Sequence, residues 1–157
     1  MEALGALGAA LADWPLAEAM RRARWGYAAA STGHVVGIAL LVGAILPFDL
    51  RLLGAWASVE RAVLARVLLP VAATGLALAV SCGVLLFLAA PADYLGAPLF
   101  LAKMALVAVG VGQAAALHLG PGLAAAGVVR LRVAGALSLA CWMGALVAGR
   151  MLAFVGA

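Results

Sequence analysis

Charged side chains are scarce in this chain. Lys, Arg, Asp and Glu together make up 10% of its 157 residues, whereas 68% of the residues are hydrophobic. A soluble domain has about 25% charged and roughly 45–50% apolar residues, so this chain has too few polar side chains to coat a soluble globule. The low charge therefore excludes a soluble domain and indicates an integral membrane protein.

Residues that carry chemistry are scarce as well, with two histidines and two cysteines in the whole chain. Cys82 and Cys141 both lie inside apolar runs, where they are interpreted as small buried hydrophobic residues and not as a disulfide. The sequence has no phosphate-binding glycine loop, no Ser/His/Asp set, no CxxC and no HExxH motif. We therefore expect no enzyme. The net charge of +4 does not indicate nucleic acid, because the basic residues bracket the apolar runs.

Four apolar runs are long enough to cross a bilayer, which takes about 20 residues. They cover about residues 27–48, 67–90, 98–119 and 133–153. The first run is expected to end at Pro47 and Asp49. The pattern predicts an all-α membrane protein, a four-transmembrane-helix bundle formed by residues 27–157.

The N-terminal segment, residues 1–26, does not read as a signal peptide, because its arginines follow its apolar part instead of preceding it. Pro15 suits the first turn of a short helix. Leu16, Met20 and Trp25 are expected to face the membrane, which predicts a short amphipathic helix lying in the interface.

An even number of spans puts both termini on one side of the membrane, called side A here; the other is side B. Each side carries five basic residues, but Lys103 and Arg150 of side A lie within spans. Without these two, side B is the more basic side. By the positive-inside rule we expect side B to face the cytoplasm of a bacterial inner membrane, with both termini on the other side.

Small residues spaced four apart mark the places where helices touch in lipid. The candidates for such contacts are Gly33 and Gly37 in the first span, Gly75 and Gly83 in the second, each four residues from Ala79, and Gly110 in the third, four residues from Ala114. They predict a compact bundle.

Polar residues inside spans are costly and are functional candidates by default. Both histidines, His34 and His118, belong to this group, as do Lys103 and Arg150. At 1.5 Å per residue the two histidines differ in depth by about 20 Å, so they do not share one haem. A dihaem cytochrome is excluded because it needs four histidines. His118 lies at the side-B edge, where an interfacial histidine needs no special role.

A boundary lies between the first span and the loop that follows it. Asp49 and Arg51 stand there, and we expect Asp49 to form a boundary ion pair with Arg51, or with Arg130 or Arg132.

His34 shares its depth with Met104, Lys103 and Arg150. A single haem b with His34 and Met104 as axial ligands is chemically allowed, and Lys103 and Arg150 would then meet its propionates. A quinone headgroup bonded to His34 is a second interpretation. Simpler alternatives stay open: His34 bonded to a neighbouring helix, and Lys103 and Arg150 extending to the side-A interface.

The run HVVGIALLVGAILPFDLRLLG, residues 34–54, resembles a family of small bacterial four-span membrane proteins classed as a domain of unknown function. That pattern combines a histidine in the first span with the motif DLRLLG, here Asp49 to Gly54. LARVLLP at 64–70 and AGRMLAF at 148–154 also fit it. The resemblance covers nearly the whole chain and implies the four-helix fold and a role for His34, but no activity. His34 also has a distant likeness to the histidines of small membrane cytochromes b.

We therefore expect a non-enzymatic membrane subunit, associated with a redox assembly, that holds one haem b or a quinone near His34. His34 would be the metal ligand. The alternative is a cofactor-free structural subunit that its glycine contacts dock into a larger complex. The expected partners are the lipid bilayer and other membrane subunits or a second copy of the chain, not nucleic acid.

Overall fold

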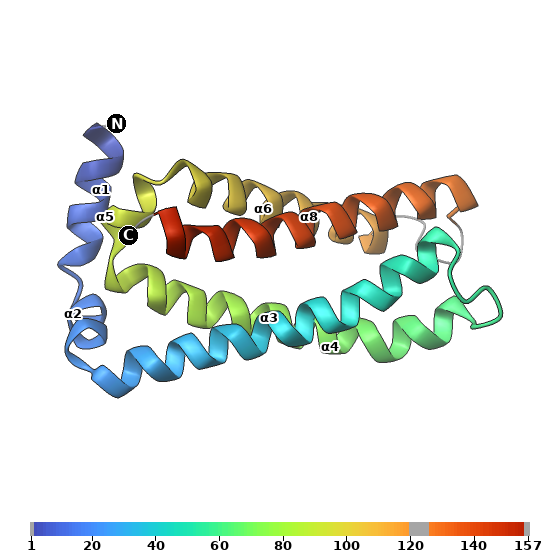
Figure 1. Cartoon of the computed structure of the whole chain (residues 1–157), viewed down its shortest axis with the longest axis horizontal. Coiled ribbons are helices and arrows are strands. Elements are labelled where there is room, and N and C mark those ends of the chain that lie inside the picture. The colour runs from blue at the N-terminus through green and yellow to red at the C-terminus, as the bar shows by residue number, and fades with distance from the viewer. Residues whose placement is uncertain (1, 120–125, 156–157) are drawn as a thin grey trace.

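Most of the described chain is helical. The computed structural model describes residues 2–119 and 126–155, and this part contains no strand. Four long helices form the bundle: α3 (Arg24–Leu53), α4 (Arg61–Ala89), α6 (Pro98–Leu119) and α8 (Val128–Val155). Each includes a segment long and apolar enough to cross a membrane. The protein is thus an all-α, multi-pass membrane protein, as its composition predicts (Figure 1).

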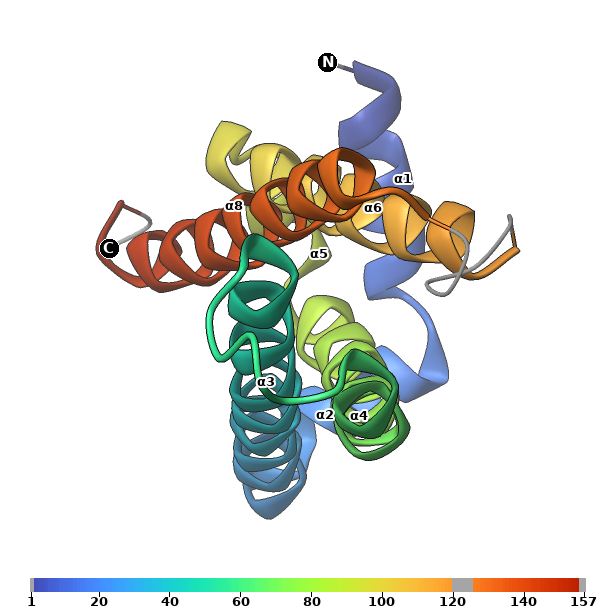
Figure 2. The same cartoon turned by 90° about the vertical axis from the view of Figure 1, so that its right-hand side faces the viewer.

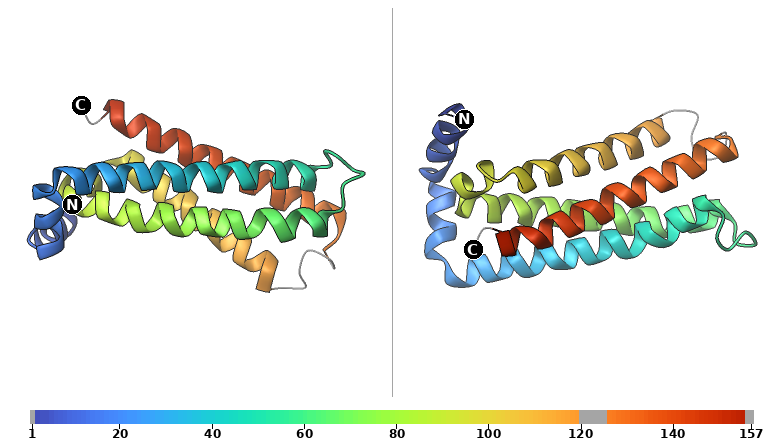
Figure 3. Two further views of the ribbon diagram at one scale, coloured as in Figure 1. Left: turned by 90° about the horizontal axis from the view of Figure 1, so that it is seen from below. Right: turned by 45° about the horizontal axis from the view of Figure 1, so that its top comes forward.

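Two short helices, α1 (Glu2–Ala12) and α2 (Pro15–Arg22), lie across the side-A end of the bundle (Figure 3). α2 corresponds to the predicted interfacial helix, and Leu16 and Trp25 are 46% and 82% exposed. Met20 was expected to face the membrane, but it is buried in the protein. It turns inward because α2 packs against α3 and α4.

The helix α1 was not predicted from the sequence. It packs on α5 (Pro91–Leu95), a short helix in the connection between α4 and α6. The approach is close at Gly8, where an added Cβ would lie 3.2 Å from Cα of Ala92. α1, α2 and α5 therefore gather at side A.

α3 extends to Leu53, beyond Pro47 and Asp49, where the first apolar run was expected to end. Proline removes one backbone hydrogen bond but does not end a helix whose continuation is held by packing. Here Phe48 and Leu52 are both buried. The helix stops at Gly54, whose φ of 117° is a left-handed conformation that favours glycine.

α3 and α4 pack backbone to backbone. An added Cβ on Gly37 would lie 2.5 Å from the backbone N of Ala79, and one on Gly75 would lie 2.5 Å from the backbone N of Leu41. No side chain fits at either position, so both glycines are required for this approach. We call this contact of Gly37 with Gly75 and Ala79 the α3–α4 seam. In lipid, such close packing takes the place of the hydrophobic effect in holding helices together.

The other three predicted glycines also lie against neighbouring helices: Gly33 against Cys82, Gly83 against His34, and Gly110 against Trp142. The contact of Gly110 with Trp142 joins α6 to α8.

The bundle consists of two helix pairs, α3 with α4 and α6 with α8, which Figure 2 separates clearly. The pairs are linked mainly by α3 and α8. Near side B these two helices touch closely, since an added Cβ on Gly135 would lie 2.9 Å from Cβ of Leu52. Toward side A they diverge (Figure 1). The bundle is therefore closed at side B and spread apart at side A.

We predict that Gly37→Leu destabilises the folded bundle by about 1–3 kcal/mol or more, because a side chain there must push α4 away. Thermal unfolding in detergent measures the loss. Gly112→Leu is the matched control, since nothing lies within 4 Å of a Cβ added to Gly112. If the two variants lost stability equally, the α3–α4 seam would not be the contact that holds the pair.

Candidate functional site

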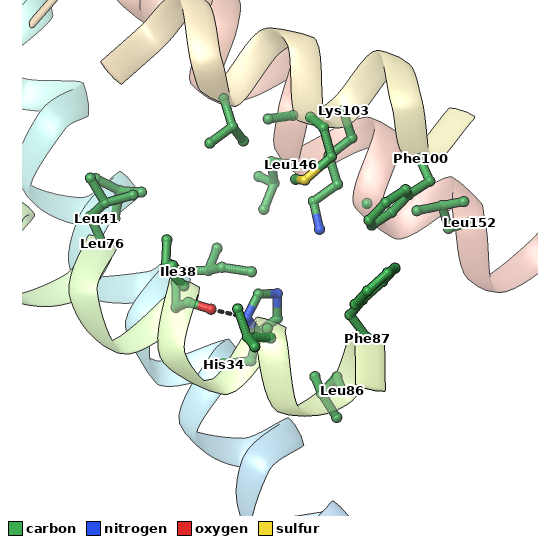
Figure 4. A pocket seen from close by; sticks show the side chains of 18 of the residues that line it. His34, Ile38, Leu41, Leu76, Leu86, Phe87, Phe100, Lys103, Leu146 and Leu152 are labelled. Atoms are coloured by element: carbon green, nitrogen blue, oxygen red, sulfur yellow. Dashed lines mark hydrogen bonds between the residues drawn. The ribbon is translucent and has the colours of Figure 1, made fainter. Parts of the chain in front are cut away.

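A cavity of about 560 Å³ lies between the two helix pairs, in the half of the bundle toward side A. α3, α4, α5, α6 and α8 all contribute to its walls, which are mostly apolar (Figure 4). Its volume falls in the range of roughly 300–1,000 Å³ that is typical of small-molecule and cofactor sites. The titratable side chains that line it are His34, Tyr94 and Lys103.

Three aromatic rings form the side-A end of the cavity. Phe87 of α4, Tyr94 of α5 and Phe100 of α6 pack on one another with ring centroids 5.2–6.1 Å apart. Phe87 and Phe100 stack on each other, and the single turn of α5 brings Tyr94 against both of them. Burial raises the pKa of Tyr94, with smaller contributions from Tyr27 and Asp93, so its phenol stays neutral.

His34 reaches the cavity from α3 with one ring nitrogen already occupied. Nδ1 lies 2.7 Å from the carbonyl oxygen of Ala79 on α4. A carbonyl oxygen only accepts hydrogen bonds, so Nδ1 carries a proton, and in the neutral imidazole Nε2 then keeps its lone pair. Figure 4 shows the second ring nitrogen turned into the cavity.

The room for the imidazole comes from Gly83 of α4. A Cβ added to Gly83 would lie 3.1 Å from Cε1 of His34 and 3.2 Å from Nδ1. The glycine therefore allows the ring to lie flat against α4 while it donates to Ala79. Gly83, predicted only as a packing residue, also shapes the site.

Lys103 faces His34 from the opposite wall. Its ammonium group points into the cavity (Figure 4), and its stem lies against Gly149, where an added Cβ would be 3.4 Å from Cε. Within the described residues, Lys103 has no ion pair and no hydrogen-bond partner. The side chain does not extend outward to the interface. An unpaired ammonium therefore points into a largely apolar space.

Of the other two residues predicted to belong to this site, Met104 and Arg150, only Met104 lines the cavity. His34, Lys103 and Met104 therefore share it. Arg150 does not line it: its guanidinium lies over the ring of Phe154, 4.7 Å from the centroid, on the exposed side of α8. The structure brings together three of the four predicted residues.

The expected ion pair of Asp49 with Arg51 is not formed. The guanidinium of Arg51 donates instead to the carbonyl oxygens of Val59 and Ala57, at 2.7 and 3.1 Å, and so holds the loop after α3. Two residues that stand two apart on a helix point in different directions, which explains the separation. The side chain of His118, which belongs to α6, lies outside what the structure describes.

Neither the aromatic cluster nor Trp142, which also lines the cavity, was predicted from the sequence. A signal for the cluster was present in the two prolines, Pro91 and Pro98, that bracket the α4–α6 connection. They mark a tight turn that returns the chain within a few residues, which brings aromatic residues on either side of it together. No comparable signal marks Trp142.

Fold and cavity define a multi-pass, all-α membrane protein with a ligand-sized site in one half of the bilayer. Comparison with protein-family models, curated proteins and solved structures gave no match.

We predict that the His34 imidazole is protonated at Nδ1 and not at Nε2. Nitrogen NMR of ¹⁵N-histidine-labelled protein distinguishes the two tautomers, and His118→Gln leaves His34 as the only histidine to observe. An Nε2–H tautomer would contradict the hydrogen bond to Ala79.

Proposed function

We propose that the protein is a membrane redox subunit that binds one haem b in the side-A cavity, with His34 as an axial ligand. The observation that carries the proposal is the orientation of His34: its Nδ1–H bonds to Ala79, and its Nε2 faces a cavity of about 560 Å³. Metal-ligating histidines in general donate their second ring N–H to a carbonyl or carboxylate, which fixes the ring and raises ligand basicity.

The metal-ligating side chains at this site favour a metal that is already held by a macrocycle. No group of three His, Cys, Asp or Glu side chains that could hold a metal ion occurs among the described residues. A bare ion would thus find His34 alone, whereas a haem iron brings four nitrogen ligands of its own. Met104 also lines the cavity, and His/Met pairs are known haem ligands. Phe87, Phe100 and the aliphatic lining suit the apolar faces of a porphyrin.

Lys103 supports the same ligand by its charge. An ammonium that points into an apolar cavity is costly unless an anion meets it. The haem propionates are such anions, and Lys103 would meet them. Arg150, outside the cavity, has no part in this proposal.

A quinone headgroup is the second candidate, favoured by the placement of Lys103 and His34 on facing walls. Lys103 would donate to a quinone carbonyl, and the Nε2 lone pair would accept from the hydroxyl of the reduced form. A cofactor-free structural subunit is the outcome if neither ligand binds.

We further propose that the protein lies in a bacterial inner membrane, with side B toward the cytoplasm and both termini away from it. The arginines at side B support this orientation, since Lys103 points into the cavity and does not count as a loop charge. Other subunits of the redox assembly would supply or accept the electron.

We predict that detergent-solubilised protein supplied with haem binds one haem per chain, seen as Soret and α bands that shift on reduction. His34→Ala is expected to abolish these bands, whereas His118→Ala keeps them, because His118 lies about 20 Å deeper along the bundle. Absence of the bands from wild-type protein, with tight binding of a short-chain quinone, would replace haem by quinone as the ligand.

We predict that Lys103 makes the site prefer an acidic haem. Wild-type apoprotein should bind haem about tenfold more tightly than haem dimethyl ester, the equivalent of about 1.4 kcal/mol for one charged contact. Lys103→Gln should remove this preference and Arg150→Gln should retain it. An unchanged preference in Lys103→Gln would show that Lys103 does not meet the propionates.

A further inference from the structure

Asp49 is a buried carboxyl group that the proposed function does not use. It is 2% exposed, although it stands only one helical turn before the side-B end of α3 at Leu53. It does not line the cavity. Phe48 and Leu52, on either side of it in α3, belong to a buried apolar cluster with Leu131 of α8.

Few hydrogen-bonding groups lie near the carboxyl group of Asp49. The Ser138 side chain on α8 forms a hydrogen bond with it, and its Oδ2 atom has no hydrogen-bond partner. Asp49 also lies where α3 and α8 pack closely, since a Cβ added to Gly135 would lie 3.0 Å from the Asp49 carbonyl oxygen. The helices therefore enclose the carboxyl group without satisfying it.

No cation compensates this carboxyl group in the described part of the chain. The arginines of side B are Arg51 on α3, Arg61 and Arg66 on α4, and Arg130 and Arg132 on α8. Arg51 is held by two loop carbonyls, and none of the five forms an ion pair with Asp49. The Arg132 guanidinium lies near Gly54, beyond the end of α3. From α4 and α6 the junction is faced by Leu64, Leu68 and Leu117, which carry no charge.

An ionised carboxylate buried without a counter-charge is far more costly than a neutral carboxylic acid. A bound cation is a poor alternative, because Mg²⁺ and Ca²⁺ take about six or more oxygen ligands and the side chains here supply only those of Asp49 and Ser138. A proton needs a single oxygen. The unpartnered Oδ2 is the atom that would carry it.

We propose that Asp49 is a proton-binding site at the α3–α8 junction, which holds a proton in the closed bundle and exchanges it with water at side B. In release, the Oδ2–H bond breaks, the proton passes to a water molecule and the electron pair stays on the carboxylate. The remaining carboxylate accepts from Ser138 and is solvated from the loop end, one turn away. This site is independent of the haem proposal, because it lies at the other end of the bundle.

Infrared spectroscopy tests the proposal directly, because the chain has only six carboxyl side chains. Wild-type protein at neutral pH should show the C=O stretch of one protonated carboxylic acid, shifted in D₂O. Asp49→Asn should remove this band, and Glu60→Gln, a change at an exposed carboxylate, should leave it. Absence of the band from wild-type protein, or its survival in Asp49→Asn, would overturn the proposal.

Isotope labelling keeps the test valid if Asp49→Asn fails to fold. Labelling with ¹³C-aspartate should move the band to lower frequency, whereas ¹³C-glutamate should not. Ser138→Ala should raise its frequency without removing it, because the carboxyl group loses a hydrogen bond. A band that moves with glutamate labelling would assign the proton to another residue and contradict the role of Asp49.

Discussion

The backbone contact between Gly37 on α3 and Gly75 and Ala79 on α4 is the constraint on which the rest of this structure depends. Lipid offers no hydrophobic drive for helix pairing, so the two helices stay together only where small residues let their backbones meet. One turn before Gly37 stands His34, and the same approach brings the Ala79 carbonyl within 2.7 Å of its ring. A packing feature thereby fixes the tautomer of the imidazole and the direction of its free nitrogen.

The cavity follows from a second constraint, the unequal linkage of the two helix pairs. α3 touches α8 closely at Gly135 near side B, while α4 and α6 are joined mainly through the short turn that contains α5. The pairs therefore spread toward side A, and the aromatic cluster of α4, α5 and α6 closes the end of the space between them. Closure at side B encloses Asp49, and divergence at side A leaves the cavity that His34 and Lys103 line. The same arrangement of helices thus produces a buried carboxyl group near side B and a cavity with polar side chains toward side A.

Much of this arrangement could be predicted from the sequence, because hydropathy and helix geometry act along the chain. The apolar runs gave the four spans, and the rise per residue placed His34, Lys103 and Met104 at one depth. Depth does not give direction around a helix. Arg150 has the predicted depth but faces away from the cavity, toward Phe154, whereas Lys103 points inward. Direction depends on the crossing of α6 and α8, which the sequence does not specify locally.

The partner of Asp49 could not be predicted from the sequence for a similar reason. Sequence proximity to Arg51 favoured an ion pair at the membrane boundary, but α3 continues past Pro47 and turns the two side chains apart. The partner of Asp49 is Ser138, which stands far along the chain and meets α3 only through the tertiary fold. Local patterns predicted the elements here, and long-range packing decided the contacts.

If the α3–α4 seam holds His34 in position for the proposed haem, variants of the seam should lose haem affinity in a haem titration. Gly75→Val separates the helices without altering any residue of the predicted ligand set, and Gly112→Val adds the same side chain where nothing lies within 4 Å. We expect wild-type protein and Gly112→Val to bind one haem per chain, whereas Gly75→Val should retain its helical circular dichroism but lose haem affinity. Wild-type haem affinity in a folded Gly75→Val variant, or no haem binding by wild-type protein, would contradict this expectation.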